Sequence, residues 1–161
     1  MITRAKGRTF LLKESLFGIL IEEGSVNRDI KPRLLIVDDV RTTREYLHVA
    51  LQEDFEIVGG AEDVPTALQS ILSTDPDLCL LDIVMPGRSG LEVLRPFRPR
   101  DGAAPRRPRF VVLSGCRRDE IVREAFLLGA SEYLFKPMEA ERLSQILRDT
   151  YLRWEREREE Y

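Results

Sequence analysis

The chain has 161 residues, of which 25 are lysine or arginine and 28 are aspartate or glutamate, so its net charge is −3. This length fits one domain with a substantial core, and the charge gives no reason to expect direct binding of nucleic acid. No apolar run reaches the roughly 20 residues that a bilayer-spanning helix needs, so no transmembrane segment is expected.

Residues 1–31 form an N-terminal extension. Basic residues followed by an apolar stretch resemble a signal peptide, but Lys13 and Glu14 interrupt the stretch and no small-residue cleavage site follows. A cytoplasmic location is therefore expected. The apolar residues are too many to leave in water, which predicts a helix that covers a face of the domain, packs in a dimer, or lies on a membrane. They are Phe10, Leu11, Leu12, Leu16, Phe17, Ile19, Leu20 and Ile21.

Strand-like and helix-like segments alternate from Arg33 onward. The predicted strands are 34–37, 56–59, 78–81, 110–113 and 132–135. The predicted helices are 41–53, a second that begins near 64, a third after the 82–90 loop, a fourth at 119–128, and a fifth that begins near 139. The first helix has an apolar stripe of Tyr46, Leu47, Ala50 and Leu51. Five such units predict an α/β fold, a doubly wound parallel sheet with its active crevice at the carboxyl ends of the strands.

The segment 95–108, after the third predicted helix, contains four prolines and several arginines. Prolines end a helix, and arginines favour exposure to water. The favoured interpretation is a surface loop. A basic loop that contacts phosphate or a partner is the alternative.

Charged residues follow three of the predicted strands. Asp38 and Asp39 come after the first, Asp82 after the third, and Lys136 after the fifth. Such groups at the ends of buried strands are costly unless they meet at a site that uses them. The carboxylates can bind Mg²⁺, and Asp82 can accept a phosphoryl group as a nucleophile.

Two further groups at this edge fit phosphoryl chemistry. Lys136 supplies positive charge to a phosphoryl group, and the hydroxyl of Ser114, at the end of the fourth strand, can donate a hydrogen bond to it. Pro137 is expected to fix the backbone after Lys136, through a cis bond. Taken singly, these residues are as typical of helix caps and turns. The prediction depends on all of them lying at one edge of one sheet.

The chain resembles the response-regulator receiver domains of two-component signalling over residues 32–150. The segments that carry the resemblance are 36–39, 81–90, 112–115 and 129–137. The resemblance implies a flavodoxin-like sheet with helices on both faces and strand order 2-1-3-4-5. It implies that the phosphodonor is a sensor histidine kinase or a histidine phosphotransfer protein. It also implies that the protein is no enzyme beyond self-phosphorylation and slow self-dephosphorylation.

The same resemblance implies roles for individual residues. Asp82 would be the phosphoacceptor, and Lys136 and Ser114 would contact the phosphoryl group. Ser114 and Tyr133 would move together as a conformational switch. The Mg²⁺ ligands would be Asp38, Asp39, Asp82 and the backbone carbonyl of Val84.

Two other functions compete with this one. A phosphatase of the haloacid-dehalogenase class also uses an aspartyl nucleophile and Mg²⁺, but it needs Asp-x-Asp after its first strand, where this chain has adjacent Asp38 and Asp39. A receiver-like scaffold that binds partners without phosphorylation is the second alternative. No output domain is recognised in the sequence, so the chain acts through protein contacts or is the regulatory part of a longer regulator.

Residues 151–161 are predicted to extend the last helix. Apolar residues recur at three- and four-residue steps, the spacing of a coiled-coil seam, which predicts a homodimer or a helix that transmits the signal. They are Leu143, Leu147, Thr150 or Tyr151, Trp154 and Tyr161. A solvated helix end, or a linker to an output domain, is the alternative. Ion pairs are expected between Arg153 and Glu157 and between Arg156 and Glu160.

Overall fold

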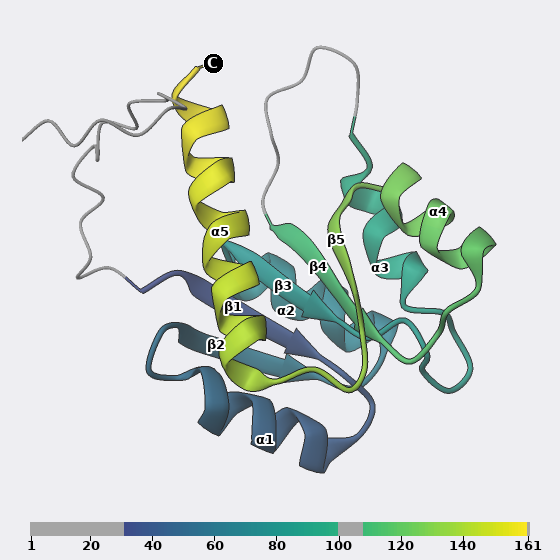
Figure 1. The fold of residues 1–161 in the computed structure, drawn as a ribbon. Coiled ribbons are helices and arrows are strands. Elements are labelled where there is room, and N and C mark those ends of the chain that lie inside the picture. Colours follow the sequence, from purple (N-terminus) through teal and green to yellow (C-terminus); the bar gives the residue numbers. More distant parts are fainter. Residues whose placement is uncertain (1–30, 100–107, 161) are drawn as a thin grey trace, which may run out of the picture.

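The five strands form one parallel sheet in the computed structural model, which describes residues 31–99 and 108–160 (Figure 1). The strands are β1 (Arg33–Val37), β2 (Glu56–Ala61), β3 (Leu78–Leu81), β4 (Arg109–Ser114) and β5 (Ala130–Phe135). Their order is β2-β1-β3-β4-β5, with every neighbouring pair parallel. The predicted fold class and strand order are confirmed. The N-terminal helix predicted for the extension lies outside the described residues, as does most of the proline-rich loop.

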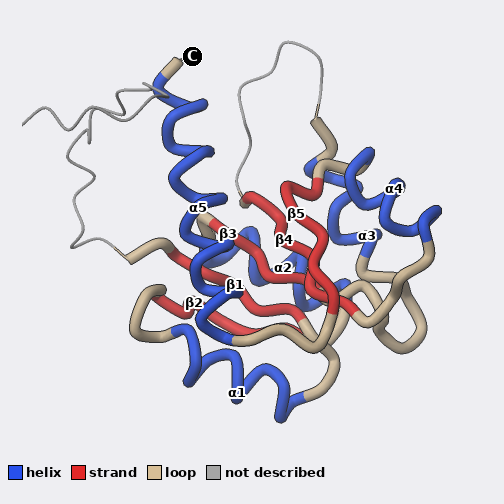
Figure 2. Tube along the Cα trace, viewed as in Figure 1, coloured by secondary structure: helices blue, strands red, loops and turns tan. Residues whose placement is uncertain are grey.

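Helices follow each of the strands in the described part of the chain (Figure 2). They are α1 (Arg41–Leu51), α2 (Val64–Thr74), α3 (Leu91–Leu94), α4 (Asp119–Leu127) and α5 (Ala140–Glu159). Asp63 caps the start of α2 by accepting the backbone N–H of Thr66, as a capping box requires. Helix α3 has a single turn and passes into a 3₁₀ turn at Arg95–Phe97 with Pro96 inside it, so the early end predicted for this helix is confirmed.

Successive side chains of a strand point to opposite faces of the sheet, and helices cover both faces. Leu34 and Ile36 pack with residues of α1 and α5, whereas Leu35 and Val37 pack with residues of α2, α3 and α4. This is why the strands read as continuous apolar runs. None of the helices in the described part of the chain combines the length and apolar character needed to span a bilayer.

Helix α1 buries a narrower stripe than the sequence predicted. Leu47 and Leu51 are buried, but Tyr46 is 59% exposed. One residue is a 100° step around a helix, and that step carries Tyr46 away from the sheet. The inclusion of Tyr46 in the apolar stripe was therefore wrong.

Helix α5 continues past Thr150 to Glu159, but its apolar stripe faces its own chain. Leu143 and Leu147 pack against the sheet, and Trp154 is fully buried, with its ring centroid 5.9 Å from that of Tyr151. The interpretation of these side chains as a seam between two chains was therefore wrong. Their spacing instead reflects packing within one chain, and Tyr161 lies outside the described residues.

The charged residues near the end of α5 also pair across the fold. Arg153 pairs with Glu132 of β5, and Glu157 pairs with Arg109 at the start of β4. The pair predicted between Arg153 and Glu157 is thus replaced by two ion pairs that tie α5 to the sheet. Sequence spacing could not show this, because both partners are distant in the chain.

Candidate functional site

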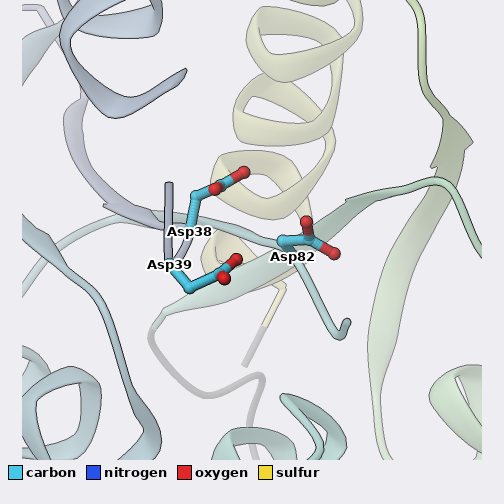
Figure 3. A group of neighbouring side chains, drawn as sticks. All are labelled: Asp38, Asp39 and Asp82. Atoms are coloured by element: carbon cyan, nitrogen blue, oxygen red, sulfur yellow. The ribbon is translucent and has the colours of Figure 1, made fainter. Parts of the chain in front are cut away.

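Three aspartates meet at the carboxyl edge of the sheet (Figure 3). Asp38 and Asp39 follow β1 and Asp82 follows β3, and these strands are neighbours in the sheet. The backbone N–H of Asp82 donates to the carbonyl of Val37 at 2.8 Å, which sets the two loops side by side. Each aspartate offers a carboxylate oxygen, and these oxygens all lie within 4.8 Å of one another. The structure therefore brings the predicted acidic residues together.

Lys136 joins this cluster from the end of β5. Its Nζ lies 2.7 Å from Oδ2 of Asp38 and 2.7 Å from Oδ2 of Asp82. The Oδ1 atom of Asp38 accepts the backbone N–H of Val40, and that of Asp82 accepts the N–H of Val84. Both carboxylates are buried, so these partners offset the cost of removing two anions from water.

Opposing effects act on the ammonium of Lys136. Burial lowers its pKa, but the hydrogen bonds and negative charges of Asp38 and Asp82 outweigh burial and raise the pKa above its ordinary value. The side chain stays protonated at neutral pH. The peptide bond between Lys136 and Pro137 is cis, as expected, and the Lys136 N–H donates to the carbonyl of Ser114 at 3.0 Å.

Ser114 and Tyr133 converge on one residue, Cys116. The buried Oγ of Ser114 accepts the N–H of Cys116 at 3.2 Å, and the hydroxyl of Tyr133 donates to the Cys116 carbonyl at 2.7 Å. Tyr133 is 9% exposed, and burial is the main cause that raises its pKa to about 12. Both side chains thus hold the loop that follows β4.

Val84 presents its backbone N–H to Asp82, and its side chain is exposed. This places Val84 directly beside the acidic cluster, as the proposed carbonyl ligand must be. Two residues of this site had no assigned role from the sequence. Arg44 donates to the Asp38 backbone, and Gly90 packs against the Asp82 backbone. Neither contact has a spacing signal, because each depends on how loops pack in three dimensions.

Gly90 is required by a close approach of two backbone segments. A Cβ at this position would lie 2.4 Å from the carbonyl oxygen of Asp82 and 2.7 Å from the Cα of Ile83. Gly90→Ala is therefore expected to shift the loop that carries Asp82 and to destabilise the fold by about 2 kcal/mol, a typical cost of overpacking.

The matched control is Gly115→Ala, because a Cβ on Gly115 meets no atom within 4 Å. Urea unfolding of both variants gives the comparison. Equal free energies of unfolding for the two variants would show that the Asp82 loop accommodates the added Cβ without loss of stability.

Comparisons with known proteins agree on one family. The family model described as "Response regulator receiver domain" matches residues 34–148. The transcriptional regulatory protein BtsR of Salmonella typhi is 38% identical over 117 residues, which cover 71% of this chain and 46% of that protein. The chemotaxis protein CheY of Halobacterium salinarum is 33% identical over 107 residues, which cover 66% of this chain and 86% of CheY. The chain spans about half the length of BtsR.

Solved structures show the same fold. The signal receiver domain of the putative response regulator NarL from Mycobacterium tuberculosis is 29% identical, with a TM-score of 0.68 over 76% of this chain and 97% of that one. A complex of CheX and CheY with BeF₃ and magnesium from Borrelia burgdorferi contains a chain that is 25% identical, with a TM-score of 0.66 over 76% of this chain and 90% of that one.

Proposed function

This chain belongs to the response regulator receiver family of two-component signalling, and we propose that it accepts a phosphoryl group on Asp82 with the help of Mg²⁺. The observation that carries the proposal is the position of the Lys136 ammonium, 2.7 Å from both Asp38 and Asp82, beside three converging carboxylates. Oxygen ligands of this kind suit Mg²⁺. The similar complex from Borrelia burgdorferi contains both magnesium and a beryllium fluoride, which supports the same pairing of cation and phosphoryl group here.

Asp82 is the nucleophile in this proposal. One of its carboxylate oxygens forms a bond to the phosphorus of a phosphohistidine on a sensor histidine kinase or histidine phosphotransfer protein. The bond between phosphorus and the imidazole nitrogen breaks, and its electron pair stays on that nitrogen. Lys136 already contacts Asp82 and supplies positive charge to the phosphoryl oxygens.

Asp38, Asp39, Asp82 and the carbonyl of Val84 would hold the metal. Bound Mg²⁺ supplies charge that offsets the repulsion between the carboxylates and the phosphoryl oxygens. The chain would catalyse only its own phosphorylation and a slow self-dephosphorylation. Val84 and Cys116 have apolar or weakly polar side chains beside the site, and these do not position a hydrolytic water.

We infer that Ser114 and Tyr133 form the switch. The Ser114 hydroxyl can donate to a phosphoryl oxygen, and both side chains bond to Cys116, so a change at Ser114 reaches Tyr133 through one residue. A hydrogen bond to a charged group contributes about 1.5–3 kcal/mol. That shifts a two-state equilibrium by about one to two powers of ten, so the active state is expected to be partly populated before phosphorylation.

Beryllium fluoride, which mimics a phosphoryl group on a carboxylate, tests both proposals on the wild-type chain. We expect Mg²⁺-dependent binding, measured by fluorine NMR, together with a change in the Tyr133 ring resonances. Absence of binding would favour the scaffold that works without phosphorylation. Binding of beryllium fluoride without a change at Tyr133 would support Asp82 as the phosphoacceptor and would rule out the switch formed by Ser114 and Tyr133.

The remaining sequence-based expectations concern binding partners and cellular location. The absence of direct nucleic-acid binding, the homodimer and the cytoplasmic location stay predictions. A dimer would need a surface other than the buried stripe of α5. BtsR is named as a transcriptional regulatory protein. The prediction is that the present chain does not itself bind nucleic acid.

A further inference from the structure

Arg44 of α1 reaches back to the loop that carries the aspartates. Its Nη1 donates to the backbone carbonyl of Asp38 at 2.6 Å, and its Nη2 lies 3.7 Å from a carboxylate oxygen of Glu62. The side chain is only 18% exposed. A Cβ on Gly60 would lie 3.4 Å from its Cδ, so the bare backbone of β2 leaves room for the stem. The guanidinium is therefore held in place on two sides.

Asp39 is the member of the acidic cluster whose carboxylate is least restrained. The carboxylates of Asp38 and Asp82 each accept a backbone N–H and the Lys136 ammonium. Within the described part of the chain, the carboxylate of Asp39 accepts no hydrogen bond. Its direction therefore depends on the backbone that carries it. That backbone begins with the peptide group whose carbonyl oxygen Arg44 holds.

The other side of Asp38 is also fixed. Its N–H donates to the carbonyl of Ala61 at 3.0 Å, so residue 38 is bound through its N–H by β2 and through its carbonyl by Arg44. Loss of the arginine bond would leave the peptide between Asp38 and Asp39 restrained only by the bond from the Val40 N–H to the Asp38 carboxylate, so that this peptide and Asp39 could shift together.

We propose that Arg44 is a positioning residue for the cation site. It orients the Asp38–Asp39 peptide so that the Asp39 carboxylate faces Asp38 and Asp82, and it does so without contacting the cation. This inference rests on the proposed function, in which the aspartates bind Mg²⁺. Partners that orient metal ligands in this way typically change metal affinity by about 10- to 100-fold when they are removed.

Charge has the opposite effect on cation binding. Removing any arginine near the site lowers the local positive charge and favours a cation, although Glu62 already offsets part of the charge of Arg44. Arg41 provides the matched control for this effect. It lies in the first turn of the same helix, its side chain is 82% exposed, and it pairs with Glu45 and not with the loop. Arg41→Met removes the same charge and leaves the Asp38 carbonyl untouched.

The test measures Mg²⁺ affinity by calorimetry and unfolding in EDTA, using the full chain. Arg44→Met and Arg44→Gln remove the bond to the carbonyl, and Arg44→Lys keeps the charge and a shorter donor. We expect Arg44→Met and Arg44→Gln to bind Mg²⁺ about tenfold more weakly than Arg41→Met, at temperatures well below unfolding. Arg44→Lys is expected to recover part of the affinity.

The outcomes separate this inference from the proposed function. A wild-type chain that does not bind Mg²⁺ would overturn both. A wild-type chain that binds Mg²⁺, with Arg44→Met and Arg44→Gln equal to Arg41→Met, would overturn only the positioning role. Arg44→Met and Arg44→Gln both remove the bond, so the test still gives a result if one of these variants folds poorly.

Discussion

Replacement of Asp82 by asparagine is expected to abolish phosphorylation by acetyl phosphate. Asp82, like Asp38, combines a strand-end carboxylate, contact with the Lys136 ammonium and a place in the acidic cluster, and it is the residue to which the proposed function assigns the phosphoryl group. Asparagine keeps the size of the side chain and can still accept the Val84 N–H, but an amide oxygen is a far weaker nucleophile than a carboxylate. The wild-type chain is expected to gain one phosphoryl group with Mg²⁺ and none in EDTA.

Intact mass measurement after incubation gives the result. Asp119→Asn is the control, because this carboxylate is exposed at the start of α4 and is not part of the cluster. Labelling of Asp82→Asn at the wild-type level would refute the assignment. Rapid release of inorganic phosphate with no phosphorylated chain accumulating would instead support a phosphatase, and a wild-type chain that neither becomes labelled nor releases phosphate would support the scaffold.

Replacement of Lys136 by methionine is expected to destabilise the fold by about 3 kcal/mol when Mg²⁺ is absent. The substitution leaves the buried carboxylates of Asp38 and Asp82 without their shared cation. Breaking a buried ion pair costs roughly 3–5 kcal/mol, and the lower end applies because the lysine side chain is 31% exposed. Methionine keeps most of the stem, so lost packing contributes little.

Added Mg²⁺ is expected to restore much of this loss, because a bound cation replaces the missing positive charge and stabilises the folded state by linkage. Urea unfolding with and without Mg²⁺ measures both effects. Lys31→Met is the control, since the bond that Lys31 makes within the described residues is an exposed hydrogen bond to the carbonyl of Gln52. A Lys136→Met chain as stable as Lys31→Met in EDTA would contradict the argument.

Most of the fold could be predicted from the sequence because it is encoded locally. The apolar runs that end in Asp38, Asp82 and Lys136 indicated both the strands and their common edge. Parallel strands place their carboxyl ends together, so residues 54 and 98 positions apart in sequence could be expected to meet. The structure confirms this meeting with two contacts of Lys136.

The wrong predictions for α5 concerned which part of the protein each face of the helix contacts. The spacing of Leu143 and Leu147 fits a seam between chains as well as it fits packing within one chain, and the sheet beside α5 decides between them. Arg153 likewise has a nearby partner four residues away in sequence, but Glu132 of β5 pairs with it instead. Periodicity shows that a face is apolar and does not show what covers it.

The roles of Arg44 and Gly90 could not be predicted for a different reason. Both act on backbone atoms, Arg44 on the carbonyl of Asp38 and Gly90 on that of Asp82. Side-chain chemistry drew attention to the carboxylates, whereas every residue has a carbonyl and none stands out in a sequence.

Helix α5 runs from one side of the sheet to the other. It begins four residues after Lys136, and Glu157, near its other end, pairs with Arg109 at the opposite edge of the sheet. Twenty residues at 1.5 Å each form a rod about 30 Å long. The helix therefore extends from the side of the sheet that carries Lys136 to the side where Arg109 begins β4.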